Sequence, residues 1–176
     1  MSKYSENLKQ GKSWEIEVSD WLRSKGMDVE LHVSYDAAGR EACQLYVFTD
    51  GNQYPHPDMT VSRKNNSIIL TYYIEVKSYN SFYKNIFKKV PTTLLNEEDE
   101  YLSIHKYQFD SYLQLSRWKE MECEIFFCVE ESRTWYYQNI EILNKNLIMV
   151  DNAYYPHETG TYYFFNKSVL KRARKY

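Results

Sequence analysis

The sequence lacks the segments that would carry a chain into or across a membrane. No apolar run approaches the roughly 20 residues that a membrane-spanning helix needs. Residues 1–17, MSKYSENLKQGKSWEIE, are polar and charged, whereas a secretory signal peptide has an apolar core. We therefore expect a soluble, cytoplasmic protein without a membrane partner.

Cysteine is scarce, and its spacing excludes the common kinds of cysteine chemistry. Cys43, Cys123 and Cys128 are odd in number and form no C-x-x-C pair. Cys123 and Cys128 lie five residues apart in CEIFFC, so on a strand they would point to opposite faces of a sheet. We expect small buried hydrophobic side chains here rather than a disulfide or a thiolate metal site.

Net charge is also nearly absent, because 22 basic and 24 acidic residues leave −2 at pH 7. The whole chain therefore offers no attractive field to nucleic acid, which would have to meet a local basic patch. Two such clusters exist: YKNIFKK, which contains Lys84, Lys88 and Lys89, and KRARK at residues 171–175. Each is either a surface for phosphate contacts and base stacking or a solvated run of charge.

Aromatic residues, in contrast, are abundant, with 18 tyrosines, 8 phenylalanines and 4 tryptophans among 176 residues. This content favours strands and packed faces over disorder. The length suffices for one full hydrophobic core, so we predict a single domain over residues 1–176.

Hydrophobic periodicity and turn residues predict an α/β chain. Trp14, Val18 and Leu22 lie at helical spacing, and Gly26 fits the position just after a helix. The expected order is a helix, a strand, a β-hairpin, a helix and a strand with additions, which indicates an α/β sandwich around a mixed sheet. The expected elements are a helix at 11–26, a strand at 27–35, an insertion or hairpin at 36–56, a hairpin at 58–77 that turns at Lys64–Asn66, a long loop at 78–102, a helix at 104–119 capped by Ser103, a strand at 123–131, a late hairpin from 134–142 and 161–165, and a short basic helix or tail at 166–176.

The second strand of the expected hairpin, IILTYYIEVK at residues 68–77, ends in a carboxylate and an amine. Alternation places Glu75 and Lys77 on one face, with Ile69, Thr71 and Tyr73, opposite a face expected to be buried. A solvated face would carry polar residues throughout, and a buried charge is costly unless it is paired or bound to metal. The pair therefore needs a partner, unless it is an exposed Glu–Lys pair at a strand end. The face expected to be buried consists of Ile68, Leu70, Tyr72, Ile74 and Val76.

Asp58 follows Pro57 at the start of the preceding strand. In a hairpin, Asp58 and Glu75 can converge at the same edge of the sheet. Two carboxylates with open coordination positions suit Mg²⁺ or Mn²⁺, which prefer oxygen ligands and retain several waters. Taken alone, the Pro57-Asp58 pair is typical of a turn.

Four motifs, in this order, resemble the PD-(D/E)xK nuclease superfamily. GKSWE at residues 11–15 is similar to the G-x-x-x-E of the first helix in archaeal-type Holliday-junction resolvases and RecB-type nucleases. Pro57-Asp58 and Glu75-Val76-Lys77 match the two halves of the superfamily's name. QFDSY at residues 108–112 is similar to the Q-x-x-x-Y that follows the catalytic strand in RecB-type nucleases.

The resemblance implies a restriction-endonuclease-like core of αβββαβ order over about residues 11–130, with a central mixed β-sheet flanked by helices. Residues 36–56 would then be an inserted hairpin, and residues 131–176 would add accessory strands and a basic C-terminal tail. The implied activity is metal-dependent hydrolysis of phosphodiester bonds in defence, recombination, repair or mobile-element biology. The implied partner is nucleic acid, with DNA favoured over RNA, and a homodimer would be needed for junction resolution.

The resemblance also implies roles for individual residues. Asp58 and Glu75 would ligate Mg²⁺ or Mn²⁺, with the Val76 carbonyl as a third ligand and Glu15 completing the site from the helix. Lys77 would position or activate the attacking water and stabilise the charge that develops on the phosphate. The basic residues Lys84, Lys88 and Lys89 gain weight as substrate contacts because they follow the E-x-K strand directly.

Some of these assignments leave alternatives open. Glu15 and Glu17 flank the apolar stripe of their helix almost symmetrically, so periodicity does not choose between them, and only the G-x-x-x-E match favours Glu15. Tyr112 is either a packed tyrosine or part of the site, and Gln108 is either a polar neighbour or a contact to the scissile phosphate or to the lysine. His105 shares their helical stripe and is a candidate phosphate contact, although a lone histidine is more often structural.

The alternative to an enzyme is a non-catalytic nucleic-acid-binding or protein-interaction module that keeps the fold. The presence of Glu15, Asp58, Glu75 and Lys77 together favours the enzyme, because a module without activity would usually have lost one of them.

Overall fold

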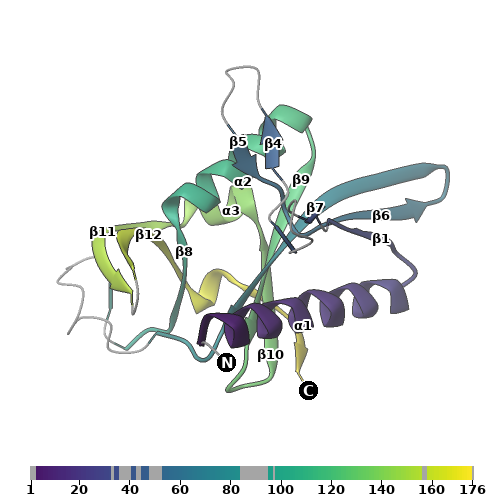
Figure 1. The fold of residues 1–176 in the computed structure, drawn as a ribbon. Coiled ribbons are helices and arrows are strands. Elements are labelled where there is room, and N and C mark those ends of the chain that lie inside the picture. Colours follow the sequence, from purple (N-terminus) through teal and green to yellow (C-terminus); the bar gives the residue numbers. More distant parts are fainter. Residues whose placement is uncertain are drawn as a thin grey trace.

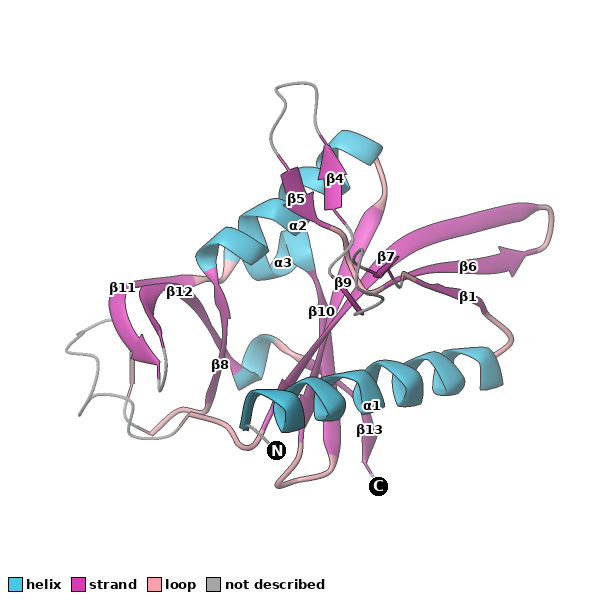
Figure 2. Cartoon of the chain, viewed as in Figure 1, coloured by secondary structure: helices cyan, strands magenta, loops and turns pink. Residues whose placement is uncertain are grey.

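The computed structural model describes most of the chain, and its elements form a central mixed sheet with helices on both faces (Figure 1, Figure 2). None of the helices in this part of the chain combines the length and apolarity needed to span a membrane. The described residues are 3–32, 34–35, 41–42, 45–47, 53–83, 95–96, 98–155 and 158–175.

The first helix, α1 (Lys3–Ser24), lies across one face of the sheet (Figure 1). Trp14, Val18 and Leu22 are buried, as their spacing of four residues predicts for one helical face. Gly26 adopts a positive φ of 78°, which glycine adopts at little cost and which ends the helix. The predicted helix is therefore present, although it begins at Lys3 rather than at Gly11.

The central sheet is mixed, as predicted, because one of its strand pairs is parallel. β7 and β9 run parallel, while the other pairs in this sheet are antiparallel. A parallel pair needs a long crossover, and α2 (Lys106–Lys119) lies within it. The strand order is β1 (Asp28–Leu31), β6 (Met59–Asn65), β7 (Ile68–Tyr79), β9 (Glu122–Val129), β10 (Thr134–Asn139) and β13 (Lys171–Lys175).

Smaller sheets surround this core. β11 (Ile148–Tyr155), β12 (Glu158–Asn166) and β8 (Tyr101–His105) form a three-stranded sheet in that order. Two short ladders lie between β1 and β6 in the sequence, where the expected insertion falls. They are β2 (Ser34–Tyr35) with β3 (Glu41–Ala42), and β4 (Leu45–Val47) with β5 (Gln53–Pro55).

Each face of the central sheet carries its own hydrophobic core. Alternation along β9 sends Cys128 to the α1 face and Cys123 to the α2 face, where both thiols are fully buried. The prediction that these cysteines are small buried groups on opposite faces is confirmed, whereas Cys43 lies outside the described residues. The α1 face contains Trp14, Val18, Leu22, Ile74, Val76, Phe126 and Trp135, and the α2 face contains Tyr73, Phe109, Tyr112, Leu115, Ile125, Phe127 and Phe165.

Two predicted boundaries are wrong. The hairpin turns at Asn66 and Ser67, since Asn65 pairs with Ile68, rather than at Lys64–Asn66. Asn66 has a φ of 55°, a conformation that asparagine tolerates. Ser103 does not cap the second helix, because it lies within β8 and pairs with Phe164 of β12.

The predicted late hairpin is also wrong. β10 pairs with β9 and β13, whereas β12 belongs to the other sheet. Residues 140–145 form a helix, α3 (Ile140–Lys145), because the Asn139 side chain accepts a hydrogen bond from the Glu141 backbone N–H and caps it. The C-terminal segment is a short 3-10 turn, Lys167–Val169, followed by the strand β13, rather than a basic helix or tail.

The alternation expected along β7 holds in only half of the strand. Ile74 is fully buried, but Ile68 and Leu70 on the same predicted face are 64% and 53% exposed, because no described element covers the turn end of the hairpin. Glu75, on the opposite face, is only 2% exposed. Both faces of β7 are therefore covered where the charged residues lie.

Candidate active site

The E-x-K strand and the preceding aspartate meet at the base of the β6–β7 hairpin. Met59 pairs with Ile74, which brings Asp58 beside Glu75. The Asp58 backbone N–H donates to Glu75 Oε2 over 3.2 Å, and the Val76 backbone N–H donates to Asp58 Oδ2 over 2.7 Å. The structure thus brings the two carboxylates together, because each of them accepts a hydrogen bond from the backbone of the other strand or its flanking residue.

Glu75 is a buried charge with nearby partners. Its Oε1 accepts a hydrogen bond from the Tyr112 hydroxyl over 2.7 Å and lies 2.5 Å from the Lys77 ammonium nitrogen. Lys77 also lies 5.6 Å from the centre of the Tyr112 ring, within the range of a cation–π contact. A buried carboxylate is costly unless paired and hydrogen-bonded, and these contacts offset that cost.

Negative charge is concentrated around Asp58. Burial raises the pKa of the Asp58 carboxyl group well above its usual range, and the charges of Glu75 and Glu15 raise it further. Lys77 and the Val76 backbone N–H lower this pKa without cancelling the rise. Burial and the neighbouring carboxylates therefore disfavour the charged form of Asp58.

The structure also distinguishes the two helix carboxylates that periodicity left open. Glu15 is the one whose charge acts on Asp58. The pKa of the Cys128 thiol is raised by burial and then by Glu17, so Glu17 acts on another part of the same face. Glu15 is thus the helix carboxylate whose charge acts on Asp58, and its role as a metal ligand stays a prediction.

Asp58 and Glu75 together fit a hard divalent cation. Their carboxylate oxygens are the ligands that Mg²⁺ and Mn²⁺ prefer, and such ions retain waters in place of further protein ligands. A bound cation would favour the charged form of Asp58 against burial and against repulsion from Glu75 and Glu15. Across the described residues, no group of three or more His, Cys, Asp or Glu side chains lies close enough together to hold a metal ion, so Glu15 is not brought into a three-carboxylate cluster.

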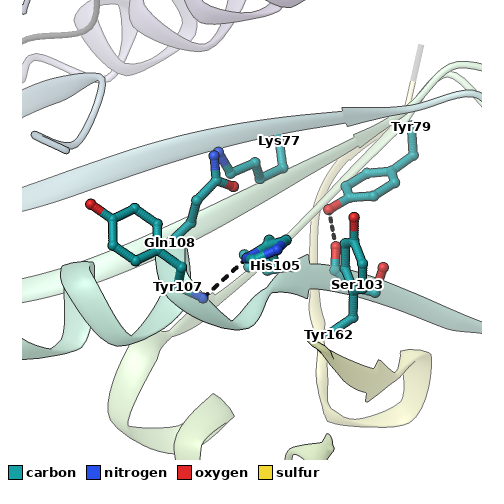
Figure 3. Close-up of a pocket in the computed structure, with 8 residues that line it drawn as sticks. Lys77, Tyr79, Ser103, His105, Tyr107, Gln108 and Tyr162 are labelled. Atoms are coloured by element: carbon teal, nitrogen blue, oxygen red, sulfur yellow. Dashed lines mark hydrogen bonds between the residues drawn. The ribbon is translucent and has the colours of Figure 1, made fainter. Parts of the chain in front are cut away.

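Tyr112 and Gln108 of the Q-x-x-x-Y motif and His105 lie near Lys77. Tyr112 bonds to Glu75 directly. Gln108 and His105 line, with Lys77, a pocket of about 330 Å³ between β7, β8 and α2. Figure 3 shows the Lys77 and Gln108 side chains extending toward each other at one end of this pocket.

The predicted basic contacts are only partly described. Lys84, Lys88 and Lys89 lie outside the described residues. Lys171 and Arg172 are exposed on β13, the edge strand of the central sheet, and three strand positions separate β13 from β7. The C-terminal cluster therefore does not adjoin the carboxylates.

A pair of histidines holds the backbone at Asp58, and the sequence did not predict their contact. The His32 and His56 rings lie 3.8 Å apart, and the Nδ1 atom of each donates to the Pro57 carbonyl oxygen, over 2.7 Å and 2.9 Å. The His32 backbone N–H also donates to the Asp58 carbonyl over 2.8 Å. Burial lowers the pKa of His56 to about 4, so its ring is neutral at pH 7. The available signal was strand register, since Leu31 pairs with Met59 and places His32 opposite Asp58.

Comparisons with known proteins find similarity in fold to solved structures. No known family model matches the sequence, and no curated protein matches it. Hjc, a Holliday junction resolvase from the archaeal hyperthermophile Archaeoglobus fulgidus, is similar with a TM-score of 0.50 and 13% identity, over 91% of this chain and 86% of that chain. A nuclease from a fusselovirus is similar with a TM-score of 0.45 and 13% identity, over 95% of this chain and 84% of that chain.

Proposed function

Since the chain has the restriction-endonuclease-like fold of the PD-(D/E)xK nucleases, we propose that it is a metal-dependent nuclease that hydrolyses phosphodiester bonds, with DNA favoured over RNA as its substrate. The observation that carries this proposal is the meeting of Asp58, Glu75 and Lys77 at the base of one hairpin, beside a pocket. Two carboxylates and a lysine are a suitable set for holding a cation and a phosphate side by side.

Asp58 and Glu75 would hold Mg²⁺ or Mn²⁺, with the Val76 carbonyl and Glu15 as further candidate ligands. When bound, such an ion neutralises phosphate charge and lowers the pKa of a coordinated water. Burial raises the pKa of Asp58, and the charges of Glu75 and Glu15, which raise it further, are the protein's own contribution to attracting the ion.

The chain's other residues would orient the reacting groups. The Lys77 ammonium lies between Glu75 and the pocket, where it can hold the attacking water or stabilise charge that develops on the phosphate. The Tyr112 hydroxyl fixes the Glu75 carboxylate from the α2 side. Gln108 and His105 line the pocket next to Lys77 and would donate to phosphate oxygens.

Further parts of the proposal rest on the resemblance. Lys84, Lys88 and Lys89 would contact the nucleic-acid backbone, because they follow the E-x-K strand in the sequence. A role in defence, recombination, repair or mobile-element biology and a homodimer are proposed on the same ground. A cytoplasmic location is proposed from the polar residues 1–17 and the lack of long apolar runs.

One observation favours a second candidate, a nucleic-acid-binding or protein-interaction module without catalysis. Both carboxylate oxygens of Glu75 already accept from protein donors, namely the Tyr112 hydroxyl, the Lys77 ammonium group and the Asp58 backbone N–H. A Glu75 committed to these contacts would serve to hold the hairpin, the helix and the lysine in place.

A cleavage assay with Mg²⁺, Mn²⁺ or EDTA separates the two candidates. Supercoiled, linear, single-stranded and four-way-junction DNA would be tested beside RNA, with wild type, Asp58→Ala and Lys77→Ala. We expect metal-dependent cutting that falls by at least about 100-fold in both variants. The exposed Lys145→Ala serves as the matched surface control and should cut normally. Binding without cutting on every substrate would favour the module.

A further inference from the structure

The pocket beside Lys77 is lined by nitrogen donors and aromatic rings. It is about 330 Å³ in volume and opens between β7, β8, β12 and α2 (Figure 3). Nitrogen donors of Lys77, Gln108 and His105 lie among its lining residues, together with several aromatic rings. The rings are those of Tyr79, Tyr107 and Tyr162.

His105 lines this pocket and carries its proton on one defined nitrogen. Its Nδ1 accepts from the Tyr107 backbone N–H over 3.2 Å and so caps α2, which leaves the proton on Nε2. On β12, a Cβ at Gly160 would lie 2.8 Å from Nε2. Because glycine has no Cβ, the backbone at Gly160 leaves the room that the His105 ring occupies.

Contacts with β8 fix two of the aromatic rings that line the pocket. Tyr162 pairs with His105 across the β12–β8 ladder, and their rings meet edge to face at 5.0 Å. The Tyr79 hydroxyl donates to the Ser103 carbonyl, so this ring is tied to β8. Tyr107, in contrast, is 54% exposed at the start of α2 and presents its ring to solvent at the rim.

The geometry points to a pocket for one unpaired nucleobase of a nucleic-acid strand, next to the phosphate held at Lys77. Aromatic faces stack on any base, while the three nitrogen donors suit the phosphate and base oxygens. The lining residues include one lysine and no arginine beside several rings, which favours a base over a free anion. In a continuous duplex each base stays stacked inside the helix, so the substrate class is single-stranded, frayed or branched nucleic acid.

This inference rests on the proposed function and names the substrate of the same site. Its first test measures binding in EDTA, where no cutting occurs. The probes are a fluorescein-labelled oligothymidylate, an abasic strand of the same length built from tetrahydrofuran spacers, a duplex, and an oligouridylate to compare RNA. Wild type should bind the base-bearing strands roughly tenfold more tightly than the abasic strand, the size expected for stacking one base.

Variants locate that preference in the pocket. Tyr107→Ala should abolish the preference for a base without affecting folding, because the ring is exposed. Gly160→Ala should weaken it by displacing His105. Trp118→Ala, which removes another exposed ring at the far end of α2, is the matched control and should retain it. Equal binding of the abasic and base-bearing strands by wild type, or an unchanged preference in both pocket variants, would overturn the inference.

A second test separates this inference from the nuclease proposal. With Mg²⁺, strands that carry one abasic position beside the cut should be cleaved more slowly than intact strands, by roughly tenfold. Cutting that ignores the missing base would leave the nuclease proposal standing and overturn the pocket. Base-dependent binding without any cutting would keep the pocket and remove the nuclease proposal.

Discussion

The two ends of the β6–β7 hairpin reverse the usual placement of polar and apolar side chains. At its base, Glu75 is 2% exposed and Asp58 is partly buried. At its turn end, Ile68, Ile69 and Leu70 are 64%, 67% and 53% exposed. Charged groups are ordinarily exposed and isoleucine and leucine are ordinarily buried, so both ends need an explanation.

Coverage by other elements accounts for the difference. At the base, α1 packs on one face of the hairpin, and Tyr112 of α2 packs on the other. The turn end reaches out past the helices in Figure 1. Successive side chains point to opposite faces along the whole strand, so the burial of each residue depends on which other elements pack against its face. The buried charged end should therefore be sensitive to substitution, and the exposed apolar end should not.

The largest effect is expected for the cation at the buried end. Lys77→Met removes the ammonium group that faces Glu75 and Asp58, and should lower the free energy of unfolding by about 3–4 kcal/mol, near the lower part of the range for breaking a buried ion pair. Asp58→Asn should instead raise the free energy of unfolding, because the raised pKa of Asp58 means that its charge destabilises the fold at neutral pH. Urea unfolding in EDTA measures both. A loss of stability in Asp58→Asn would contradict this account.

The second effect is a pH dependence at the same end. The pKa of His56 is about 4 in the folded protein and 6.5 as a free side chain, so between these values the unfolded chain binds a proton that the folded chain does not. This contribution is present above pH 6.5 and is lost as the pH falls toward 4, by up to about 3 kcal/mol. His56→Asn should flatten that part of the profile of unfolding free energy against pH. Parallel profiles for wild type and variant would show that His56 has no such role.

The third effect concerns the hydroxyl that reaches Glu75 from α2. Tyr112→Phe should cost about 2 kcal/mol, because a buried carboxylate loses a hydrogen-bond donor. Tyr107→Phe is the matched control on the same helix, since that tyrosine is exposed, and its thermal unfolding should match wild type. Equal transitions for both variants would mean that the hydroxyl contributes nothing measurable to Glu75.

The smallest effect is expected at the apolar end. Ile69→Ser should change stability by less than about 0.5 kcal/mol, because the side chain is 67% exposed. Ile74→Ala, five residues along the same strand and fully buried, should cost about 3 kcal/mol. Similar losses at the two positions in urea unfolding would show that the turn end is covered in solution, and would remove the contrast between the ends.

Local patterns were sufficient to predict much of this fold. The stripe of Trp14, Val18 and Leu22 predicted α1, and the CEIFFC segment predicted β9, because burial on one face leaves a period in the sequence. α3 was missed because its apolar residues suggested a strand, although Asn139 was a readable helix cap. The partners of β8, β12 and β13 were not readable, because strand pairing over long sequence separations leaves no local signal.

The contacts of the candidate site were likewise predictable only in part from the sequence. The convergence of Asp58 and Glu75 followed from hairpin geometry, because an antiparallel pair joined by a short turn has few registers. The bond from Tyr112 to Glu75 and the histidine pair at Pro57 depend on how separate elements dock. The pattern of apolar and polar residues within one helix or strand does not indicate which other element it packs against.

The parallel pairing of β7 with β9 also has a kinetic consequence. Glu75 pairs with Ile125, and this contact closes only after the chain between them has crossed over, which is slow compared with formation of a local hairpin. Asp58 and Glu75 can thus meet early, before α2 docks. Because Tyr112 reaches Glu75 only when the crossover closes, loss of its hydroxyl should speed unfolding and leave the rate of the early folding step unchanged.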